Sequence, residues 1–539
     1  MIHDVVIVGA GPNGLMLACE LSLAGVRPVV LESRPEPGAE PRANGLVGQV
    51  VRILDRRGLY ERITGQAGPP VPAPAFMFAA MHLDLAALDD NPLYTLPVPQ
   101  ARLVQILADR AAELGVEVRH GHELTGLTQD DEAVTLTVAG PDGSYQARAR
   151  YLAGADGGHS ITRKRSGIGF PGVTRDHTVS RTMSATPPAE WIDPVTRTLN
   201  VPGYGPVPLT MHHRTETGMF TFGVLPGRPP IVVTTEYDPP DDTDKPLTLA
   251  EMEESIQRVL GVAVPLTPPP GDGPQVRRRL IGSNTRLAER YRDRRVVLVG
   301  DAAHVHSAAG GPGLNLGLQD AVNLGWKLAA AVRDDRRASL LDTYESERRP
   351  VAERVIMQTQ AQSALTVPGP DVTALRQLFG ELLADPRIVA HLARTMAGSD
   401  VRYEAGEADK VGAHPLTGRL APDLELRIAG GIAGGTAVGT AGGPVRLAQL
   451  TREARPLLLD LTEKGLPADG PWELVRARPE TDVSPAPGAD EKPEPGPDPV
   501  PVTALLLRPD TYVAWASSSA SPDTAEIGAL RAAADRWLS

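Results

Sequence analysis

The chain of 539 residues contains one cysteine, Cys19. A single thiol excludes intrachain disulfides, CxxC redox chemistry and a cysteine-based zinc site, so we expect Cys19 to be a packed helix residue and predict no metal. Aromatic residues make up only 4% of the sequence, and the net charge is -12. Binding to nucleic acid needs a basic excess or stacking aromatic side chains, so the composition argues against a nucleic-acid partner.

Long apolar runs are also missing. No uninterrupted stretch approaches the roughly 18 residues that span a bilayer. The N-terminal segment carries Asp4 and Glu20 and has no basic leader, which argues against a signal peptide. We therefore expect a cytoplasmic protein without a membrane partner. Hydrophobic residues make up 41% of the chain, which suffices for large cores, and the length predicts about three domains.

A glycine-rich motif lies close to the start. Residues 9–14 read GAGPNG between an apolar run and a stretch of helical periodicity, and a second apolar run leads to an acid. Glycines at these places permit a tight turn, a close approach to a pyrophosphate and close helix packing, and the acid is placed to accept from a ribose hydroxyl. This pattern predicts an adenine dinucleotide site, FAD or NAD. Its candidate residues are Gly9, Gly11, Pro12, Asn13, Gly14, Glu32 and Ser33.

A second motif distinguishes these cofactors. Residues 300–304 read GDAAH after an apolar run, and a glycine-rich loop then leads into a helical pattern. Here the sequence resembles the class A flavoprotein monooxygenases, the para-hydroxybenzoate hydroxylase-like aromatic hydroxylases. The resemblance implies that Asp301 bonds the FAD ribitol, and that the loop presents backbone N–H groups to the flavin. The loop candidates are Gly311, Gly313, Leu314 and Asn315.

Further segments support the same resemblance. Residues 154–163, GADGGHSITR, resemble the family's DG fingerprint, which implies that Asp156 lies near the FAD and nicotinamide pyrophosphates. By resemblance, Arg42 reaches a pyrophosphate or the nicotinamide cofactor, and Gln100 contacts the flavin side. Residues 399–403 and 414–419 most closely resemble hydroxylases of angucycline and anthracycline polyketide biosynthesis.

The expected fold is α/β with three domains. A Rossmann-like FAD-binding domain is predicted at 1–172 and 276–395, and a β-rich substrate domain at 173–275. A thioredoxin-like domain is predicted at 396–539, where the Pro-, Asp- and Glu-rich loop 480–502 is expected to be disordered. Without cysteine this last domain cannot be a thiol oxidoreductase. A structural or oligomeric role is expected, which leaves a homodimer open.

The resemblance implies a monooxygenase. Non-covalent FAD would be reduced by NADPH, O₂ would add at C4a, and the hydroperoxide would hydroxylate a polycyclic aromatic polyketide. No side chain is assigned as a catalytic acid or base, and His304 and His306 are expected to be structural. Adjacent strand residues face opposite ways, so at most one of His212 and His213 would line a substrate pocket.

Two positions depart from the family pattern. Ala308 replaces a usual proline, and Pro312 removes an N–H donor from the glycine-rich loop. Both bear on how oxygen is aimed at the substrate.

The sequence leaves open a Baeyer–Villiger or ring-opening oxygenase on the same scaffold, and a non-catalytic flavin-bearing polyketide-binding protein. It separates neither NADPH from NADH nor one polyketide from another, and a plain NAD-dependent dehydrogenase has no reason to carry GDAAH.

Overall fold

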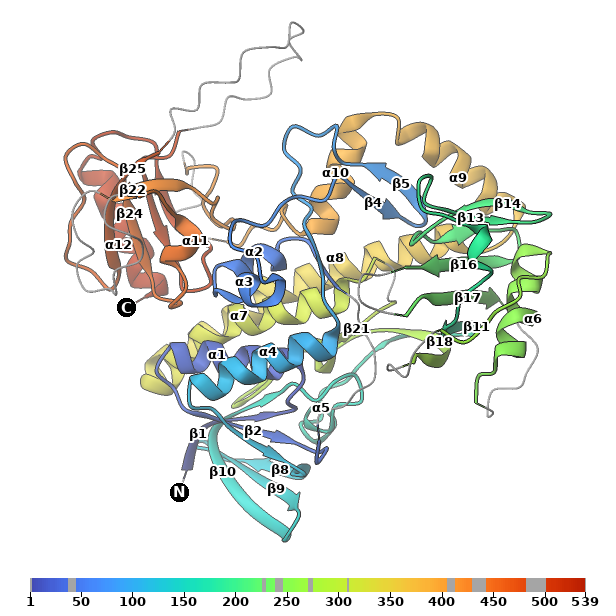
Figure 1. Ribbon diagram of the computed structural model, residues 1–539. Helices are drawn as coiled ribbons and strands as arrows, with labels where there is room; N and C mark the ends of the chain where they lie inside the picture. The colour runs from blue at the N-terminus through green and yellow to red at the C-terminus, as the bar shows by residue number, and fades with distance from the viewer. Residues whose placement is uncertain are drawn as a thin grey trace, which may run out of the picture.

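The computed structural model is a mixed α/β protein, as predicted (Figure 1). It describes residues 2–36, 45–224, 229–237, 246–269, 275–307, 310–404, 413–428, 443–480 and 501–538. Its first sheet runs in the order β19 (Arg292–Asp293), β20 (Val296–Leu298), β10 (Gly143–Gly154), β1 (Ile2–Val8), β2 (Pro28–Glu32) and β7 (Glu117–His120). Two further strands, β8 (Glu123–Gln129) and β9 (Val134–Gly140), extend it through β10.

The centre of this sheet is parallel, because β20, β10, β1, β2 and β7 pair parallel to their neighbours. Val5 and Val30 on these strands are fully buried, as expected for strands covered on both faces. One face is covered by α1 (Pro12–Leu23), α4 (Gln100–Glu113) and α7 (Pro312–Arg333), as Figure 1 shows.

A second sheet lies to the right in Figure 1. Its order is β15 (His213–Arg214), β16 (Gly218–Gly223), β17 (Ile231–Tyr237), β11 (Gly172–Ser184), β18 (Arg277–Leu287) and β21 (His304–Val305). Helix α6 (Leu249–Leu260) covers one face and packs on Phe220, Phe222 and Val232. A small sheet of β12 (Ile192–Asp193), β13 (Thr198–Val201) and β14 (Gly205–Pro208) adjoins it, and η1 (Ala189–Trp191) precedes it.

The second sheet extends beyond the predicted substrate domain, which ended at residue 275. Strand β18 pairs with β11 over most of its length, and β21 pairs with β18. The sequence of β18, RRRLIGSNTRL, carries no alternation of apolar and polar residues. The strand is held by its neighbour, and no local pattern marks it.

The middle of the chain adds helices beside both sheets. The long helix α8 (Asp342–Thr366) follows η3 (Asp335–Leu341) and leads to α9 (Pro370–Leu382) and α10 (Pro386–Ala397). The hairpin of β4 (Ala75–Phe78) and β5 (Met81–Asp84) packs against these helices. The remaining elements before the C-terminal unit are β3 (Gly45–Val47), α2 (Val50–Asp55), α3 (Leu59–Thr64), β6 (Thr95–Pro97), α5 (Ile161–Arg165) and η2 (Gly300–Ala302).

The C-terminal unit lies to the left in Figure 1. Its sheet order is β23 (Val445–Arg446), β22 (Glu425–Ile428), β25 (Glu473–Pro479), β24 (Leu457–Asp460), β26 (Ala504–Leu507) and β27 (Val513–Ser517), with α11 (Leu447–Leu450) and α12 (Thr524–Trp537). The predicted thioredoxin-like class of this unit stays a prediction. Nearly all of the predicted disordered loop 480–502 lies outside the described residues. None of the described helices is long and apolar enough to cross a membrane.

Candidate functional site

Four adjoining strands end at one edge of the first sheet. Because β20, β10, β1 and β2 run parallel, their carboxyl ends lie together. The GAGPNG motif follows β1, Glu32 ends β2, the DG segment follows β10, and the GDAAH motif begins two residues after β20. Ligands of open α/β sheets bind outside the carboxyl ends of the strands. The structure thus brings the three sequence motifs to one edge.

Gly9 and Gly14 make backbone approaches that exclude a larger residue. Gly9 has φ +104°, and a Cβ there would lie 2.5 Å from the carbonyl oxygen of Ala155. A Cβ on Gly14 would overlap the Gly9 carbonyl oxygen. Strand β1, the DG segment and α1 are therefore in direct backbone contact, which only glycine permits.

Gly11 is different, because it faces open space. Its backbone is extended, at φ -71° and ψ 176°, and a Cβ there would meet no atom within 4 Å. Pro12 begins α1, and the amides of Asn13 and Gly14 follow in the first turn, where a helix has no acceptor of its own. Free space in front of a helix N-terminus fits the pyrophosphate of a dinucleotide.

Asn13 joins the first motif to the second. A Cβ on Gly300 or on Gly317 would clash with the side-chain amide of Asn13. The Oδ1 atom of Asn13 is buried and has no hydrogen-bond partner among the described residues. A buried acceptor without a partner calls for an explanation, and a donor on a bound cofactor would satisfy it.

Helices α1 and α7 run side by side in the same direction. Asn13 touches Gly317 near the start of both helices, and Glu20 touches Gly325 about two turns further along each. Their N-termini therefore converge on the carboxyl edge of the sheet. Two helix N-termini at the same edge, each with a positive dipole end, favour the binding of a group with delocalised negative charge.

Glu32 is held in place by backbone amides. Its Oε2 accepts from the amide of Ala10 at 2.9 Å, and its Oε1 accepts from the amide of Arg34 at 3.0 Å. An ionised carboxylate has further lone pairs, so this orientation leaves capacity for a ribose hydroxyl. Ser33 follows it and is exposed.

The carboxylate of Asp156 in the DG segment accepts hydrogen bonds from the protein itself. It accepts from the Ser160 hydroxyl at 2.5 Å, and from the Thr162 amide and hydroxyl at 2.9 Å and 3.0 Å. The adjoining Arg163 donates to the carbonyl oxygens of Ala302, at 2.9 Å, and Gly158, at 3.0 Å. The DG segment is therefore hydrogen-bonded to the GDAAH turn through Arg163.

The GDAAH motif begins as a 3₁₀ turn, η2, in which Asp301 is exposed. His304 is buried, and its Nε2 lies 2.7 Å from Oδ2 of Asp320 on α7. The ring of His306 stacks beside that of His304, and burial lowers the pKa of His306 to about 4, so its imidazole is neutral at physiological pH. These contacts favour structural roles for both histidines.

The glycine-rich loop enters α7 through a left-handed residue, Gly311, at φ +69°. Pro312 is the first helical residue, a position whose N–H has no intrahelical acceptor in any case. The Asn315 side chain bridges two segments: its Nδ2 donates to the Gly311 carbonyl at 2.8 Å, and its Oδ1 accepts from the Val47 amide at 3.0 Å. Asn315 thus fixes the loop, and Gly313 and Leu314 supply first-turn amides.

Of three remaining predicted positions, the structure describes only one. Gln100 begins α4 and is half-buried. Arg42 lies outside the described residues, and so does Ala308. Their predicted roles therefore stay predictions.

The two adjacent histidines of the second sheet point to different partners. Nδ1 of His212 lies 2.7 Å from the hydroxyl of Thr221, and Nε2 of His213 lies 2.6 Å from the hydroxyl of Tyr204. Phe220 and Phe222 pack toward α6, so Thr221 between them faces the opposite side of the sheet. His212 therefore lies on the face away from α6. The prediction placed both histidines in a strand, but β15 begins only at His213.

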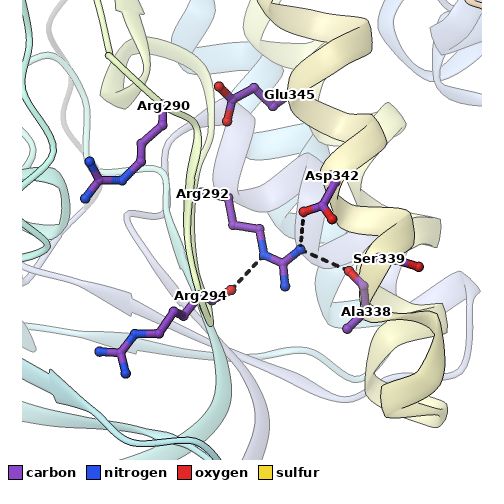
Figure 2. A pocket seen from close by; sticks show the side chains of 7 residues that line it. All are labelled: Arg290, Arg292, Arg294, Ala338, Ser339, Asp342 and Glu345. Carbon is purple, nitrogen blue, oxygen red and sulfur yellow. Dashed lines mark hydrogen bonds and ion pairs between the residues drawn. The ribbon is translucent and has the colours of Figure 1, made fainter.

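A cavity of about 500 Å³ lies elsewhere, beside Arg290, Arg292 and Arg294 (Figure 2). Arg294 precedes β20, so this cavity lies near the amino end of that strand and away from the motifs. Arg292 is committed to Asp342 at 2.7 Å and to two backbone carbonyls. We do not assign the candidate site to it. No cluster of three metal-ligating side chains occurs in the described part of the chain.

Comparison with known families agrees with this geometry. The family described as "FAD binding domain" matches residues 3–359, and the one described as "Aromatic-ring hydroxylase, C-terminal" matches residues 414–539. The chain belongs to the class A FAD-dependent aromatic hydroxylases. It is thus an FAD-dependent aromatic monooxygenase, which confirms the predicted family and enzyme class.

Individual relatives match over nearly the whole length. A 12-dehydrotetracycline 5-monooxygenase/anhydrotetracycline 6-monooxygenase of Streptomyces rimosus is 39% identical over 98% of this chain and 97% of its own. The structure of OxyS anhydrotetracycline hydroxylase from Streptomyces rimosus has a TM-score of 0.78 at 36% identity, with 100% and 99% of the two chains covered. CabE, an aromatic hydroxylase from angucycline biosynthesis, has a TM-score of 0.77 at 31% identity, with 100% and 99% covered.

Sequence reasoning missed the side chains that support the motifs. Arg163 is only the last residue of the DG segment, and Asp320 belongs to no motif, yet the first contacts the GDAAH turn and the second holds His304. A charged residue inside an otherwise apolar helical stretch, such as Asp320 in α7, is the one signal that could have indicated it.

Proposed function

We propose that this protein uses NAD(P)H and O₂ to hydroxylate a polycyclic aromatic polyketide, with the oxygen delivered from a flavin C4a-hydroperoxide. The observation that carries the proposal is the convergence of α1 and α7 at the sheet edge from which β21 crosses into the second sheet. Bound FAD supplies the redox and oxygen chemistry, and the protein supplies position, charge and exclusion of water.

We call the N-termini of α1 and α7, together with Gly11, Glu32 and Asp301, the flavin cradle. Different residues of the cradle would bind different parts of FAD. The space before Gly11 and the amides of Asn13 and Gly14 would hold the pyrophosphate, and Glu32 would accept from the adenosine ribose. Asp301 would accept from the ribitol hydroxyls. By the family resemblance, Arg42 would reach the pyrophosphate or the nicotinamide cofactor, and Gln100 would contact the flavin side. Ser33 stays a candidate residue beside Glu32.

The N-terminus of α7 would hold the isoalloxazine ring. Reduced flavin carries negative charge at N1 and C2–O, and the first-turn amides of Gly313 and Leu314 offer donors and a positive dipole end there. Pro312 removes one donor without interrupting the helix, because it occupies the first helical position.

The second sheet would present the substrate to the flavin. Strand β21 follows directly from the GDAAH turn and pairs with β18, so the flavin loop and this sheet share backbone. Thr221 and Val233 are opposite each other in register and face away from α6. His212 lies on the same face, where its Nδ1 contacts the hydroxyl of Thr221. The relative named for anhydrotetracycline supports a polycyclic aromatic substrate.

The test is an incubation of purified, FAD-loaded protein with NADPH, isotopically labelled O₂ and candidate polycyclic polyketides. We expect substrate-stimulated NADPH oxidation and a product that carries one labelled oxygen on an aromatic carbon. A labelled ester or lactone oxygen would instead identify a Baeyer–Villiger or ring-opening reaction. Binding of the polyketide without NADPH consumption would identify the non-catalytic alternative.

A simpler measurement tests the cofactor. The purified protein should be yellow and should release FAD on denaturation with heat or acid. Flavin that stays attached to the denatured chain would contradict non-covalent binding. The proposal places the reaction in the cytoplasm, where NAD(P)H is supplied, and requires no dimer.

A further inference from the structure

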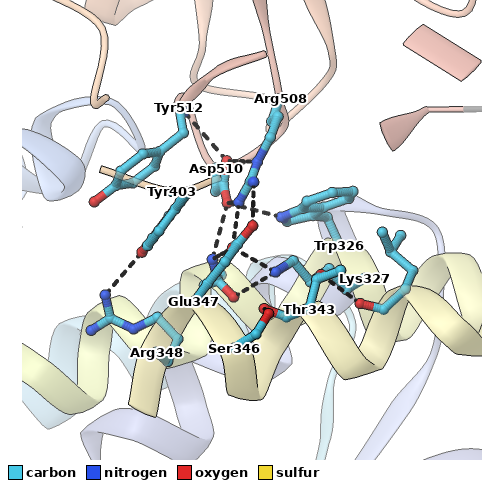
Figure 3. Close-up of polar contacts among 12 residues, drawn as sticks. Trp326, Lys327, Thr343, Ser346, Glu347, Arg348, Tyr403, Arg508, Asp510 and Tyr512 are labelled. Atoms are coloured by element: carbon cyan, nitrogen blue, oxygen red, sulfur yellow. Dashed lines mark hydrogen bonds and ion pairs between the residues drawn. The ribbon is translucent and has the colours of Figure 1, made fainter. Parts of the chain in front are cut away.

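Glu347 on α8 is the centre of a buried charge cluster between the flavin-binding part and the C-terminal unit (Figure 3). Arg508, which follows β26, donates to its two carboxylate oxygens at 2.6 Å and 2.9 Å. Lys327 and Asn323 of α7 each donate to Glu347 at 2.6 Å. Arg508 also donates to Asp510, at 3.1 Å from its Nε.

The cluster is balanced in charge and shielded from water. The side chains of Lys327, Glu347, Arg508 and Asp510 are at most 5% exposed. Burial lowers the pKa of Lys327 to about 8, whereas Arg508 and Lys327 overcome burial and hold the pKa of Glu347 at about 2. Removal of one partner from such a cluster leaves an uncompensated buried charge.

Aromatic rings enclose the Arg508 guanidinium. Its central carbon lies 4.6 Å from the ring centroid of Trp537, 5.1 Å from that of Trp326 and 5.2 Å from that of Tyr403. Trp326 belongs to α7, and Trp537 belongs to the last helix of the C-terminal unit. Cation–π contacts and hydrogen bonds therefore fix Arg508 from both sides of the interface.

The next residue of α8, Arg348, continues the chain of contacts to the GDAAH motif. Its Nε donates to Asp320 at 2.7 Å, and the other oxygen of Asp320 lies 2.7 Å from Nε2 of His304. Arg348 also donates to the Tyr403 hydroxyl at 2.9 Å, and the Tyr403 ring stacks on Tyr512 of the C-terminal unit at 4.2 Å. A continuous series of buried contacts thus joins the C-terminal unit to the strand that follows Asp301.

A second series of contacts reaches α1. Buried Arg57 donates to both oxygens of Glu20 on α1, at 2.6 Å and 3.0 Å. The same guanidinium donates to the carbonyls of Thr451, at 3.0 Å, and Pro509, at 2.8 Å, in the C-terminal unit. Both helices of the cradle are therefore tied to this unit through a buried arginine.

We propose that the C-terminal unit is a positioning element of the flavin site. Arg508 holds Glu347, and Tyr512 supports, through Tyr403, the adjoining Arg348, which fixes His304 through Asp320. The proposal rests on the proposed FAD site, because it assigns the loop held by His304 to the flavin. In this role the C-terminal unit, which has no cysteine, would keep the GDAAH turn and the start of α7 in the positions that FAD binding requires. Arg508 and Tyr512 touch neither cofactor nor substrate in this account, so they are positioning residues.

The test measures FAD affinity of the full-length apoprotein by quenching of flavin fluorescence, for Arg508→Met, Arg508→Lys and the parent. We expect the FAD Kd to rise roughly tenfold for Arg508→Met, in the range typical of couplings between distant sites. Arg508→Lys keeps the charge but loses the two-pronged contact, so its Kd should rise by roughly threefold. Arg531→Met is the matched control, because Arg531 lies in the same unit, pairs with Asp469 at 3.5 Å and is 59% exposed. Its Kd should equal that of the parent.

A double-variant cycle separates positioning from general destabilisation. If the contacts act in series, Asp320→Asn and Arg508→Lys together should raise the Kd by less than the product of the two single effects. Each apoprotein's melting temperature is recorded, so that Kd refers to folded protein.

The outcomes distinguish the two proposals. A parent that binds no FAD would defeat the proposed function itself. A parent that binds FAD, with folded Arg508→Lys and Arg508→Met variants that bind it equally tightly, would overturn the positioning role. Effects of Arg508 and Asp320 that multiply independently would also overturn it, because the contacts would then not act in series.

Discussion

The flavin cradle and the charge cluster at the C-terminal unit share helix α7, but the first is formed mainly by backbone groups and the second by side chains. The cradle at the start of α7 consists of backbone: glycines in close approach, first-turn amides and open space before Gly11. The cluster about four turns further along α7 consists of side chains, in which Lys327 and Arg508 pair with Glu347 and Asp510. The first arrangement leaves donors for a ligand, and the second leaves few.

The difference explains what each region does when it is altered. A cradle made of backbone fails when a side chain is added, and a cluster made of charges fails when a charge is removed. At Gly11, where there is open space, an added side chain can abolish binding without unfolding the chain, whereas at Gly14 it meets backbone and acts on stability. Removal of a charge from the cluster also acts first on stability.

The largest effect is expected for Gly14→Ala. Its Cβ would overlap the Gly9 carbonyl oxygen, and neither α1 nor the turn can move without disturbing the sheet. We expect a loss of about 3 kcal/mol of folding stability or more. Gly380→Ala in α9 is the control, because its Cβ would meet no atom within 4 Å, and it should be neutral or slightly stabilising. Chemical denaturation of both variants decides, and a Gly14→Ala protein as stable as the parent would refute the close approach.

A somewhat smaller effect is expected for Glu347→Gln. The change leaves Arg508 and Lys327 without their shared carboxylate and should cost on the order of 3 kcal/mol at neutral pH. Because the folded-state pKa of Glu347 is depressed to about 2, its contribution is full above about pH 4.5 and is lost as the pH falls toward 2. Melting temperatures of parent and variant should therefore converge in acid. A constant difference between pH 7 and pH 3 would show that the charge of Glu347 does not matter.

Asp301→Ala should act on the cofactor more than on the fold. Loss of a charge-assisted bond to the ribitol is worth roughly 1.5 to 3 kcal/mol, so FAD affinity should fall by one to two orders of magnitude. The measurement is flavin occupancy at limiting FAD. Unchanged occupancy would remove Asp301 from the cofactor site.

The smallest effect is expected for Cys19→Ser. Cys19 is buried in α1, its Sγ lies 3.8 Å from the Leu107 carbonyl, and burial raises its pKa to about 12. A thiol that stays protonated has no redox task here, and a serine hydroxyl can make the same contact. NADPH oxidation and product formation should match the parent, with a stability loss of about 1 kcal/mol. A folded, FAD-loaded variant without turnover would contradict this.

The three motifs could be recognised in the sequence because their signals are local. The turn at Gly9, the acid at Glu32 and the loop before α7 each depend on a few neighbouring residues whose conformation the glycines dictate. The carboxyl ends of parallel strands then gather these segments at one edge. The leucine runs of β24 and β26 are a local signal of the same kind, because continuous apolar runs of this length are typical of strands that are wholly buried.

The supporting structure could not be predicted in this way. Arg348 and Asp320 are separated by 28 residues and Arg508 and Glu347 by 161, so no window of sequence holds both partners. Strand β18 is defined by its pairing with β11, and its arginine-rich sequence carries no strand pattern. Such elements depend on tertiary contacts that only the fold creates.

The central claim is that the converging N-termini of α1 and α7 form an FAD site, and Gly11→Ala tests it most directly. The added methyl meets no protein atom and suits the extended backbone of Gly11, so the apoprotein should keep the parent's melting temperature. In the holoprotein it would occupy the space proposed for the pyrophosphate. We predict a rise of the FAD Kd by about a hundredfold or more, since misplacement of a close contact costs a few kcal/mol. An FAD Kd equal to that of the parent in a folded Gly11→Ala protein would contradict the account.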